Sequence, residues 1–427
     1  MHIVGVVVFV LLVLSVPIGI ALSAAAAAYI AFDPLLTSEV IFRAFFNFIS
    51  RYSLMAIPLF IFAGFLMEKT GLVGQLFKFS DSLVGWMPGG FGVATVLACV
   101  LFGTMSGSSV AMAAAMSIIA IPEMRKRGYP DWLSGGLVAT AGGIAILIPP
   151  SIPLILYGIV TETSIVRLFF AGVIPGLLLA LGNALSVMLI ASILKLPRGR
   201  FERRRVWVEF KGAAPALGMP VVVLGGLYGG LFTPTEAAAA ACGYALVYGL
   251  IARGRPFVGE VLPTACRSLN LTAVIVFLIG SVGVFQFLLA NMYWPQRIAE
   301  TVTSWGLTPL GFIFAYMAVL IILGMFVDGV AMILLTVPVV FPIAMALKID
   351  PVHLAIIVTL NIEMGVVTPP VGLNLFAVSG TSKIPLMQVM KGTIPFFVGD
   401  LAVLLLVIFF PTLATWLPSV LVTDVFK

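Results

Sequence analysis

Charged residues are scarce along this chain. Asp, Glu, Lys and Arg make up 9% of the 427 residues, while 61% of the residues are apolar. In a typical soluble domain roughly a quarter of the residues are charged. The longest polar segment, residues 195–211, is too short to form a soluble domain of its own. The composition therefore excludes a soluble protein and predicts a chain that is embedded in a membrane.

Cysteine and histidine are also few. Cys99, Cys242 and Cys266 stand in apolar surroundings without metal-binding spacing, and His2 and His353 are each solitary. We therefore expect neither a histidine or cysteine metal site nor a Ser/His/Asp relay, and we predict that the chain is not an enzyme. The phosphate-binding pattern G-x-x-x-x-G-K-[ST] is also missing, which argues against ATP hydrolysis by this chain.

Long apolar runs are abundant instead, and they predict an all-α polytopic membrane protein, since one crossing needs about 20 apolar residues. The run at 3–32 has no basic start or clear cleavage site, so we interpret it as a retained first helix that Pro17 could divide. Segments 39–50 and 256–270 are predicted to lie along the interface as amphipathic arms. Nine crossings are expected, around residues 3–32, 53–67, 133–160, 168–194, 213–231, 236–252, 271–292, 352–380 and 395–422.

The chain carries an internal repeat with an offset of 220 positions. Proline or glycine interruptions that recur in the apolar segments of two halves point to the midplane site of a secondary transporter. The repeat therefore predicts a protein that moves a small solute across a membrane. The recurring residues are Pro149-Pro150 with Pro369-Pro370, Gly172 with Gly392, Pro175 with Pro395, Met112 with Met332, Pro122 with Pro342 and, one position out of step, Pro88 with Pro309 and Pro130 with Pro351.

The basic residues predict the orientation of the two halves. Residues 195–211 hold seven Lys/Arg and two Glu, which supply +5 of the net charge of +6. Short basic loops stay on the cytoplasmic side, and this explains the charge better than a nucleic-acid-binding patch does. Two crossings earlier, residues 125–127 are again basic, whereas the matching loop of the second half carries only Lys348 and Asp350. The same motif then faces opposite sides, as in an inverted-topology repeat, with the N-terminus cytoplasmic and the C-terminus periplasmic.

The repeat also gives a domain organisation. The first repeat covers 1–194, with a hairpin at 91–125 and a broken helix at 133–160. The basic loop covers 195–211, and the second, inverted repeat covers 212–427, with a hairpin at 307–347 and a broken helix at 352–380. Both hairpins are predicted to be re-entrant, with polar tips at 106–109 and 328–329. Two ordinary membrane-crossing helices would return the chain to the same side of the membrane as a re-entrant hairpin does. The charge distribution alone therefore does not distinguish the two structures.

The polar tips and the proline pairs together suggest an ion site. Proline lacks an N–H, so it frees carbonyls that can join hydroxyls or a carboxylate around a hard cation. The half-helix N-termini beyond each break would face an anion, and Ser109 and Asn374 are candidates to contact it. Tips made of small residues can also serve only to let helices pack closely. The recurrence of such a tip together with a proline pair in both halves favours a binding site. The predicted sodium ligands are Ser106, Ser108, Ala145, Ile148, Pro150, Asp328, Gly329, Gly365, Thr368 and Pro370.

Carboxylates within the membrane are expensive and usually functional. Asp328 is the strongest single candidate because it lies in the second polar tip. Glu236 and Glu363 are either functional or structural hydrogen-bond partners. Asp400 is interpreted as lying near a helix end.

Several segments together resemble the large membrane subunit of tripartite ATP-independent periplasmic (TRAP) transporters, and the resemblance extends over essentially the whole chain. It implies a multi-pass protein of the bacterial inner membrane, a periplasmic binding protein that delivers the solute, and a small membrane subunit. It also implies a sodium-driven elevator in which hairpins and broken helices slide against a static frame. Ala145 departs from the glycine usual in the family. The second tip has Asp328 rather than serine, so the two sodium sites should not be equivalent. The resembling segments are residues 106–109, 148–153, 225–237 and 368–372.

The leading hypothesis is thus the large permease subunit of a sodium-driven tripartite importer of an organic anion. Dicarboxylates, sugar acids and sialic-acid-like carboxylates remain open as substrates, and Na+ would be the coupling ion in place of any cofactor. A second hypothesis is a self-sufficient sodium/anion symporter or a cation/proton antiporter with a similar inverted repeat. An intramembrane enzyme using Asp328 or Glu363 lacks a partner nucleophile or metal cluster, and a scaffold without transport leaves both polar breaks unexplained.

Overall fold

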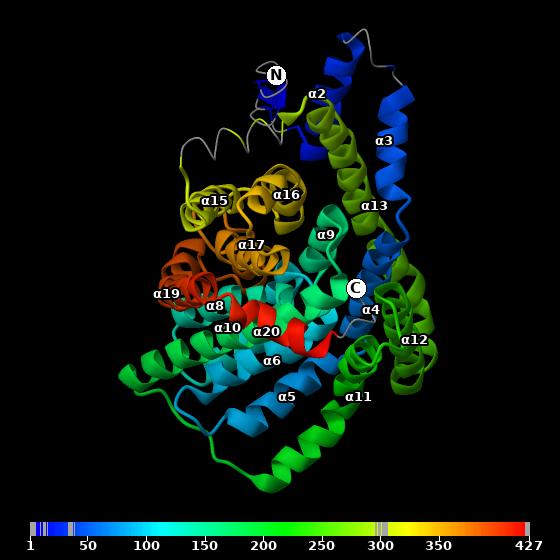
Figure 1. Ribbon diagram of the computed structural model, residues 1–427. Helices are drawn as coiled ribbons and strands as arrows, with labels where there is room; N and C mark the ends of the chain where they lie inside the picture. The colour runs from blue at the N-terminus through cyan, green and yellow to red at the C-terminus, as the bar shows by residue number, and fades with distance from the viewer. Residues whose placement is uncertain are drawn as a thin grey trace.

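The computed structural model describes residues 16–32, 39–294 and 306–422, with isolated positions in 6–14 and at 37, 297 and 300 (Figure 1). These residues form helices and connecting turns, and no strand occurs among them. Seven of the helices are long and apolar enough to cross a membrane, which agrees with the polytopic protein predicted from composition. The helices are α2 (Ile18–Phe32), α3 (Glu39–Ile49), η1 (Tyr52–Met55), α4 (Ala56–Lys69), α5 (Leu72–Val84), α6 (Gly90–Ser106), α7 (Ser109–Lys126), α8 (Asp131–Ala141), η2 (Gly142–Ile146), α9 (Ile152–Thr161), α10 (Ile165–Ile193), α11 (Arg203–Tyr228), α12 (Pro234–Arg253), α13 (Arg255–Asn291), α15 (Pro309–Gly324), α16 (Gly329–Ala346), α17 (Pro351–Val366), α18 (Leu373–Ser382), α19 (Leu386–Phe409) and α20 (Thr412–Leu421).

The helices divide into two groups that pack side by side (Figure 1). We call α2, α3, α4, α11, α12 and α13 the frame, in which α4 packs on α12 and α13, and α13 packs on α2 and α3. We call η2 and helices α6–α10 and α15–α20 the inner bundle, where α8 lies against α19 and α10 lies against α6, α17 and α19. Helix α5 joins the groups because it packs on both α6 and α11.

Both proline pairs interrupt helices, as the sequence predicts. In the first half, α8 and the short 3-10 helix η2 end before Pro149-Pro150, and α9 begins at Ile152. In the second half, α17 ends at Val366 and α18 begins at Leu373. Each proline pair contains a cis peptide bond. Proline cannot donate a backbone hydrogen bond, so the helical ladder stops at each pair.

Polar side chains cap the N-termini of four helices in the two hairpins and broken helices. The hydroxyls of Ser108 and Ser151 accept hydrogen bonds from the first turns of α7 and α9. The carboxylates of Asp328 and Asp350 do the same for α16 and α17. Such N-caps supply acceptors for backbone N–H groups that have no partner within the helix. The polar hairpin tips therefore also have a structural role.

Three predicted boundaries differ from the structure. Helix α11 begins at Arg203, so only the first part of the basic segment 195–211 is irregular. Segment 256–270 is not a separate arm, because α13 runs without a break from Arg255 to Asn291. At 1.5 Å per residue its 37 residues extend about 55 Å, well beyond the roughly 30 Å of hydrocarbon. The predicted crossing at 395–422 is divided between α19 and α20.

The N-terminal apolar run lies partly outside the described residues. Within them, Val16 and Pro17 are not helical, and α2 begins directly after the proline. Segment 39–50 forms the separate helix α3, which packs against α13.

Candidate functional site

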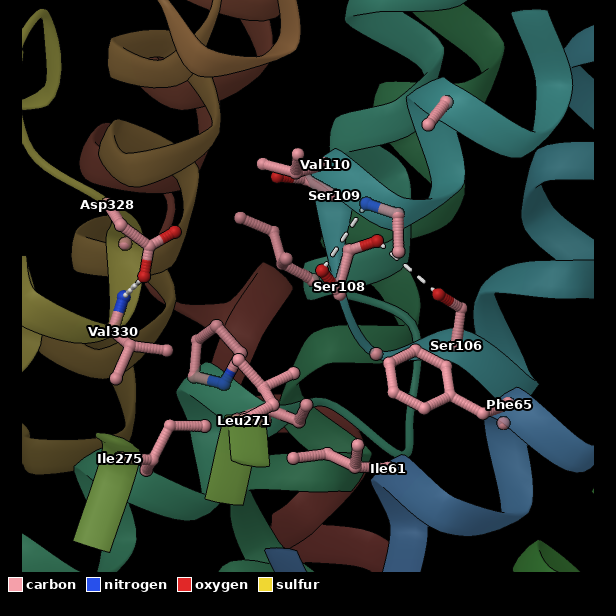
Figure 2. Close-up of a pocket in the computed structure, with 18 of the residues that line it drawn as sticks. Ile61, Phe65, Ser106, Ser108, Ser109, Val110, Leu271, Ile275, Asp328 and Val330 are labelled. Carbon is pink, nitrogen blue, oxygen red and sulfur yellow. Dashed lines mark hydrogen bonds between the residues drawn. The ribbon is translucent and has the colours of Figure 1, made fainter. Parts of the chain in front are cut away.

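A cavity of about 600 Å³ lies where the inner bundle meets the frame (Figure 2). The first polar tip, residues 106–109, lines one side, and Asp328 with Val330 from the second tip lies across from it. Apolar side chains of the frame helices α4 and α13 close a third side, including Phe65 and Leu271. The two tips are more than 200 positions apart in sequence, so the fold brings both halves of the repeat to one cavity.

The first tip lies directly on the first helix break. Gly107 has φ of 60°, a left-handed conformation that glycine adopts without strain, and it ends α6. A Cβ atom at Gly107 would lie 3.1 Å from the carbonyl oxygen of Pro150. The hydroxyl of Ser106 donates to the carbonyl of Ser108 at 3.4 Å, which spans the turn. The turn of the first tip and the carbonyl of Pro150 are therefore neighbours.

The second tip lies on the second break in the same way. The backbone N–H of Gly372 donates to the carbonyl of Met325 at 3.1 Å, which joins the loop after α17 to the end of α15. The carboxylate of Asp328 accepts from the N–H of Val330 at 3.0 Å and lines the cavity. This tip therefore holds both a carboxylate, that of Asp328, and neutral backbone carbonyl oxygens.

A small-residue contact recurs between tip helix and break in both halves. A Cβ atom at Gly324 of α15 would lie 2.6 Å from the Cα of Gly365, so only two glycines allow this approach. The corresponding residues of the first half are Gly103 and Ala145, where a Cβ atom at Gly103 would lie 3.1 Å from the Cα of Ala145. The methyl group of Ala145 therefore faces a glycine, and the first contact is less close than the second.

The two residues proposed to face the solute contact each other. The hydroxyl of Ser109 donates to Oδ1 of Asn374 at 3.3 Å, and Nδ2 of Asn374 donates to the carbonyl of Ala139 at 3.0 Å. Ser109 lines the cavity, whereas Asn374 is fully buried behind it. This bond connects the hairpin of the first half with the broken helix of the second.

The ten proposed sodium ligands divide into two sets. Ser106, Ser108, Asp328 and Gly329 line the cavity. The other six are not among the lining residues and belong to the two breaks, where the hydroxyl of Thr368 already donates to the carbonyl of Met364 at 2.5 Å. The second set is Ala145, Ile148, Pro150, Gly365, Thr368 and Pro370.

Four helix N-termini meet at the cavity. The first residues of α7, α9, α16 and α18 all line it, and they belong to both hairpins and both broken helices. Each N-terminus carries partial positive charge from its unpaired N–H groups. The cavity therefore presents a positive backbone potential, which favours an anion, next to the carboxylate of Asp328, which favours a cation.

The frame contributes charged residues that sequence reasoning missed. Arg267 of α13 and Glu68 of α4 both line the cavity, and Nη1 of Arg267 lies 3.8 Å from Oε2 of Glu68. The guanidinium of Arg267 also lies over the ring of Phe65, 4.3 Å from its centroid. Arg267 was missed because 256–270 was interpreted as an interfacial arm, and Glu68 lies directly after the predicted crossing at 53–67. Had 255–291 been recognised as one long apolar helix, Arg267 within it would have indicated a functional residue.

The remaining carboxylates have different roles from one another. Glu236 is exposed and forms a capping box, in which its Oε2 accepts from the backbone N–H and the hydroxyl of Thr233. Asp400 does not lie near a helix end: it is in the middle of α19 and accepts from Nδ2 of Asn183 at 2.9 Å. Glu363 is fully buried, and neither of its carboxyl oxygens has a hydrogen-bond partner.

Comparisons with known proteins identify the family. Residues 5–413 match the family model for the DctM component of tripartite ATP-independent periplasmic transporters. The chain is 40% identical to the C4-dicarboxylate TRAP transporter large permease protein DctM of Pseudomonas aeruginosa, over 86% of this chain and 87% of that protein. It is 36% identical to the ectoine/5-hydroxyectoine permease UehC of Ruegeria pomeroyi and 34% identical to the sialic acid permease SiaM of Vibrio cholerae, each over 96% of both chains.

A solved structure shares the fold. The YdaH transporter of Alcanivorax borkumensis matches with a TM-score of 0.63 over 96% of this chain and 98% of that chain, at 13% sequence identity. At that identity the likeness concerns the fold alone. The family match and the related permeases, together with the candidate membrane spans, indicate a multi-pass protein of the bacterial inner membrane. The chain belongs to the family of large permease subunits, the DctM components, of tripartite ATP-independent periplasmic transporters.

Proposed function

We propose that this chain takes an organic anion from a periplasmic binding protein and moves it inward, driven by sodium ions, by an elevator motion of the inner bundle against the frame. The observation that carries the proposal is the convergence of four helix N-termini and two polar tips on one cavity. Related permeases named for dicarboxylates, sialic acid and ectoine support a small carboxylate as the substrate class.

Anion binding follows from the electrostatics of the cavity. The N-termini of α7, α9, α16 and α18 face a carboxylate without adding a charged side chain whose burial would be costly. Arg267 adds a guanidinium at the frame side, 3.8 Å from the carboxylate of Glu68. Ser109 supplies a hydroxyl that lines the cavity and is held in place by Asn374.

Sodium binding follows from the oxygen atoms at the two tips. Gly107, between Ser106 and Ser108, lies beside the carbonyl of Pro150. Met325, three residues before Asp328, accepts a hydrogen bond from Gly372 in the loop that follows α17. Moving a dianion inward against a potential of 100 mV costs about 4.6 kcal/mol, at about 2.3 kcal/mol per charge. Two sodium ions moving with the dianion cancel this electrical cost, so the sodium gradient then drives uptake.

The proposed motion needs a surface along which the two groups of helices can slide. The cavity lies at that surface, with the tips on the inner bundle and apolar side chains of α4 and α13 on the frame. A small membrane subunit would hold the frame, and the binding protein would set much of the selectivity.

Reconstitution in proteoliposomes tests this function. The chain is combined with a small membrane subunit and a binding protein encoded beside it, and uptake of a radiolabelled dicarboxylate or sialic acid is measured. We expect accumulation only with an inward sodium gradient and the binding protein present. Equal uptake by the chain alone would instead support a self-sufficient symporter, and equal uptake without sodium would contradict sodium coupling.

A further inference from the structure

A basic and aromatic surface lies outside the cavity, where α10 connects to α11. Both helices are candidate membrane spans, so the segment that joins them lies at one face of the membrane. Residues 195–211, which include the start of α11, hold seven Lys/Arg and two Glu. We call the surface formed by this segment and the adjacent Trp86 the basic face.

The protein leaves most of the charge of the basic face without a counter-charge. Arg205 is the exception, because its Nη2 lies 2.7 Å from Oδ2 of Asp81, a carboxylate that Arg127 contacts at 3.0 Å. The other six basic side chains are exposed and form no ion pair within the described part of the chain. Only Glu202 and Glu209 oppose them in the segment, so an excess of positive charge remains. The six are Lys195, Arg198, Arg200, Arg203, Arg204 and Lys211.

Aromatic side chains from two segments meet on the same face. Trp86, in the turn between α5 and α6, contacts Phe201 edge to face, with 6.3 Å between the ring centroids. The backbone N–H of Gly199 donates to the carbonyl of Gly85 at 3.0 Å, which fixes the connecting segment against this turn. Trp86, Phe201 and Trp207 are nevertheless 49%, 55% and 60% exposed. Large parts of their rings are therefore available to a partner.

The length of α11 places the basic face at the depth of the lipid headgroups. The helix has 26 residues, and its charged side chains all lie within 203–211. The rest of the helix, residues 212–228, extends about 26 Å at 1.5 Å per residue, close to the roughly 30 Å of hydrocarbon. The first turns therefore lie outside the hydrocarbon, and in Figure 1 they extend beyond the neighbouring helices at the lower edge of the view.

We propose that the basic face binds anionic phospholipids, whose phosphate groups contact the arginines and whose glycerol region contacts the aromatic rings. Arginine forms paired hydrogen bonds to phosphate oxygens, and each basic side chain near an anionic membrane surface adds attraction. Tryptophan is enriched at the level of the headgroups. A zwitterionic lipid carries a cation beside its phosphate, which the basic face repels, so the surface selects lipids with a net negative charge.

The lipid surface goes beyond the proposed transport and does not depend on it. It lies at a chain connection between the two groups of helices, since α10 belongs to the inner bundle and α11 to the frame. The ion pairs of Asp81 with Arg127 and Arg205 also join α5, α7 and α11 here. Bound lipid thus anchors the start of α11 at the membrane surface.

Native mass spectrometry of the full chain in a neutral detergent tests the proposal. Phosphatidylglycerol or phosphatidylcholine with the same acyl chains is added in steps, and the lipids bound to each protein are counted. We expect tighter binding of phosphatidylglycerol to the wild-type chain. The triple variant Arg198→Gln, Arg200→Gln, Arg204→Gln should lose at least tenfold of this affinity, since each basic side chain contributes about fivefold. Its affinity for phosphatidylcholine should stay unchanged.

A second triple variant, Arg43→Gln, Lys348→Gln, Lys383→Gln, is the matched control. It removes the same charge from exposed positions elsewhere, and it should bind phosphatidylglycerol as the wild-type chain does. Equal losses in the two triple variants would overturn the proposal, because net charge alone would then explain the binding.

Two results on the wild-type chain would also overturn the proposal. One is equal affinity for the two lipids, and the other is displacement of phosphatidylglycerol by millimolar inorganic phosphate, which would make the surface a site for a free anion. If the first triple variant does not insert into membranes, Arg200→Gln decides, with an expected loss of about fivefold. The titration measures no transport, so its failure leaves the proposed function standing, and a lack of sodium-driven uptake leaves the lipid surface standing.

Discussion

At the scale of single residues, a comparison of two aspartates allows helix capping to be tested apart from the proposed sodium binding. Asp328 and Asp350 each begin a helix with a carboxylate that accepts from a backbone N–H. Only Asp328 lines the cavity. Since an uncharged cap would start α16 equally well, we propose that the charge of Asp328 serves sodium binding.

Replacing Asp328 with asparagine tests its proposed sodium role. Asparagine is also a good N-cap, so the helix should persist while the negative charge is lost. Loss of an interaction with a charged group, worth about 1.5–3 kcal/mol, should raise the sodium concentration for half-maximal uptake about 10- to 150-fold. Uptake is measured against sodium in proteoliposomes, with Asp350→Asn as the matched control. An unchanged sodium response of the Asp328 variant would remove it as a ligand.

Arg267 provides a second test at this scale. Its guanidinium is partly exposed, and interactions of such charges contribute up to about 1 kcal/mol, so Arg267→Gln should raise the KM for the anion roughly two- to fivefold. Arg255→Gln, an exposed arginine in the first turn of the same helix, is the control. The response to sodium should stay as in the wild-type chain. A KM that does not change would show that the anion does not contact the frame at this residue.

At the scale of elements, the helix breaks at the proline pairs could be predicted from the sequence, whereas the packing of helices against one another could not. The proline pairs predicted both breaks because a missing N–H acts locally. The continuity of α13 was not predictable, because Pro263 lies inside the helix and the polar residues before it suggested a separate arm. The contact of Ser109 with Asn374 and the fit of Glu363 over Gly143 depend on tertiary packing between the halves, which the pattern of a single segment does not contain.

The contact between the second tip and the second break should tolerate no added methyl group. In Gly324→Ala the new Cβ atom would meet the backbone of Gly365 at 2.6 Å, so α15 must shift. Overpacking of this kind costs about 1–3 kcal/mol, and we expect a lower melting temperature with strongly reduced uptake. Both are measured on purified protein and in proteoliposomes.

Gly380→Ala in α18 is the matched control, because no atom lies within 4 Å of the added Cβ. It should keep the melting temperature or raise it, since alanine favours a helix over glycine. If both variants behave alike, close packing at the second break has no role in transport.

At the scale of the whole molecule, the orientation of the two halves in the membrane is the main prediction from charge. The irregular segment before α11 carries Arg198 and Arg200, both exposed, and the basic start of α11 follows it. A cysteine at position 200 should react with a membrane-impermeant thiol reagent only from the cytoplasmic side. Labelling is measured in intact cells and in inverted vesicles, in a background where exposed Cys266 is replaced by serine. Labelling in intact cells would show that this loop faces the periplasm and would contradict the predicted orientation.

The central claim is that both halves of the repeat form one site for an anion and sodium. The most direct measurement is an experimental density map of the chain in nanodiscs with sodium and a transported carboxylate. The account predicts anion density between the N-termini of α7 and α16, with cation density beside Ser106 and Asp328. Anion density away from this cavity, or helices that continue unbroken through both proline pairs, would contradict it.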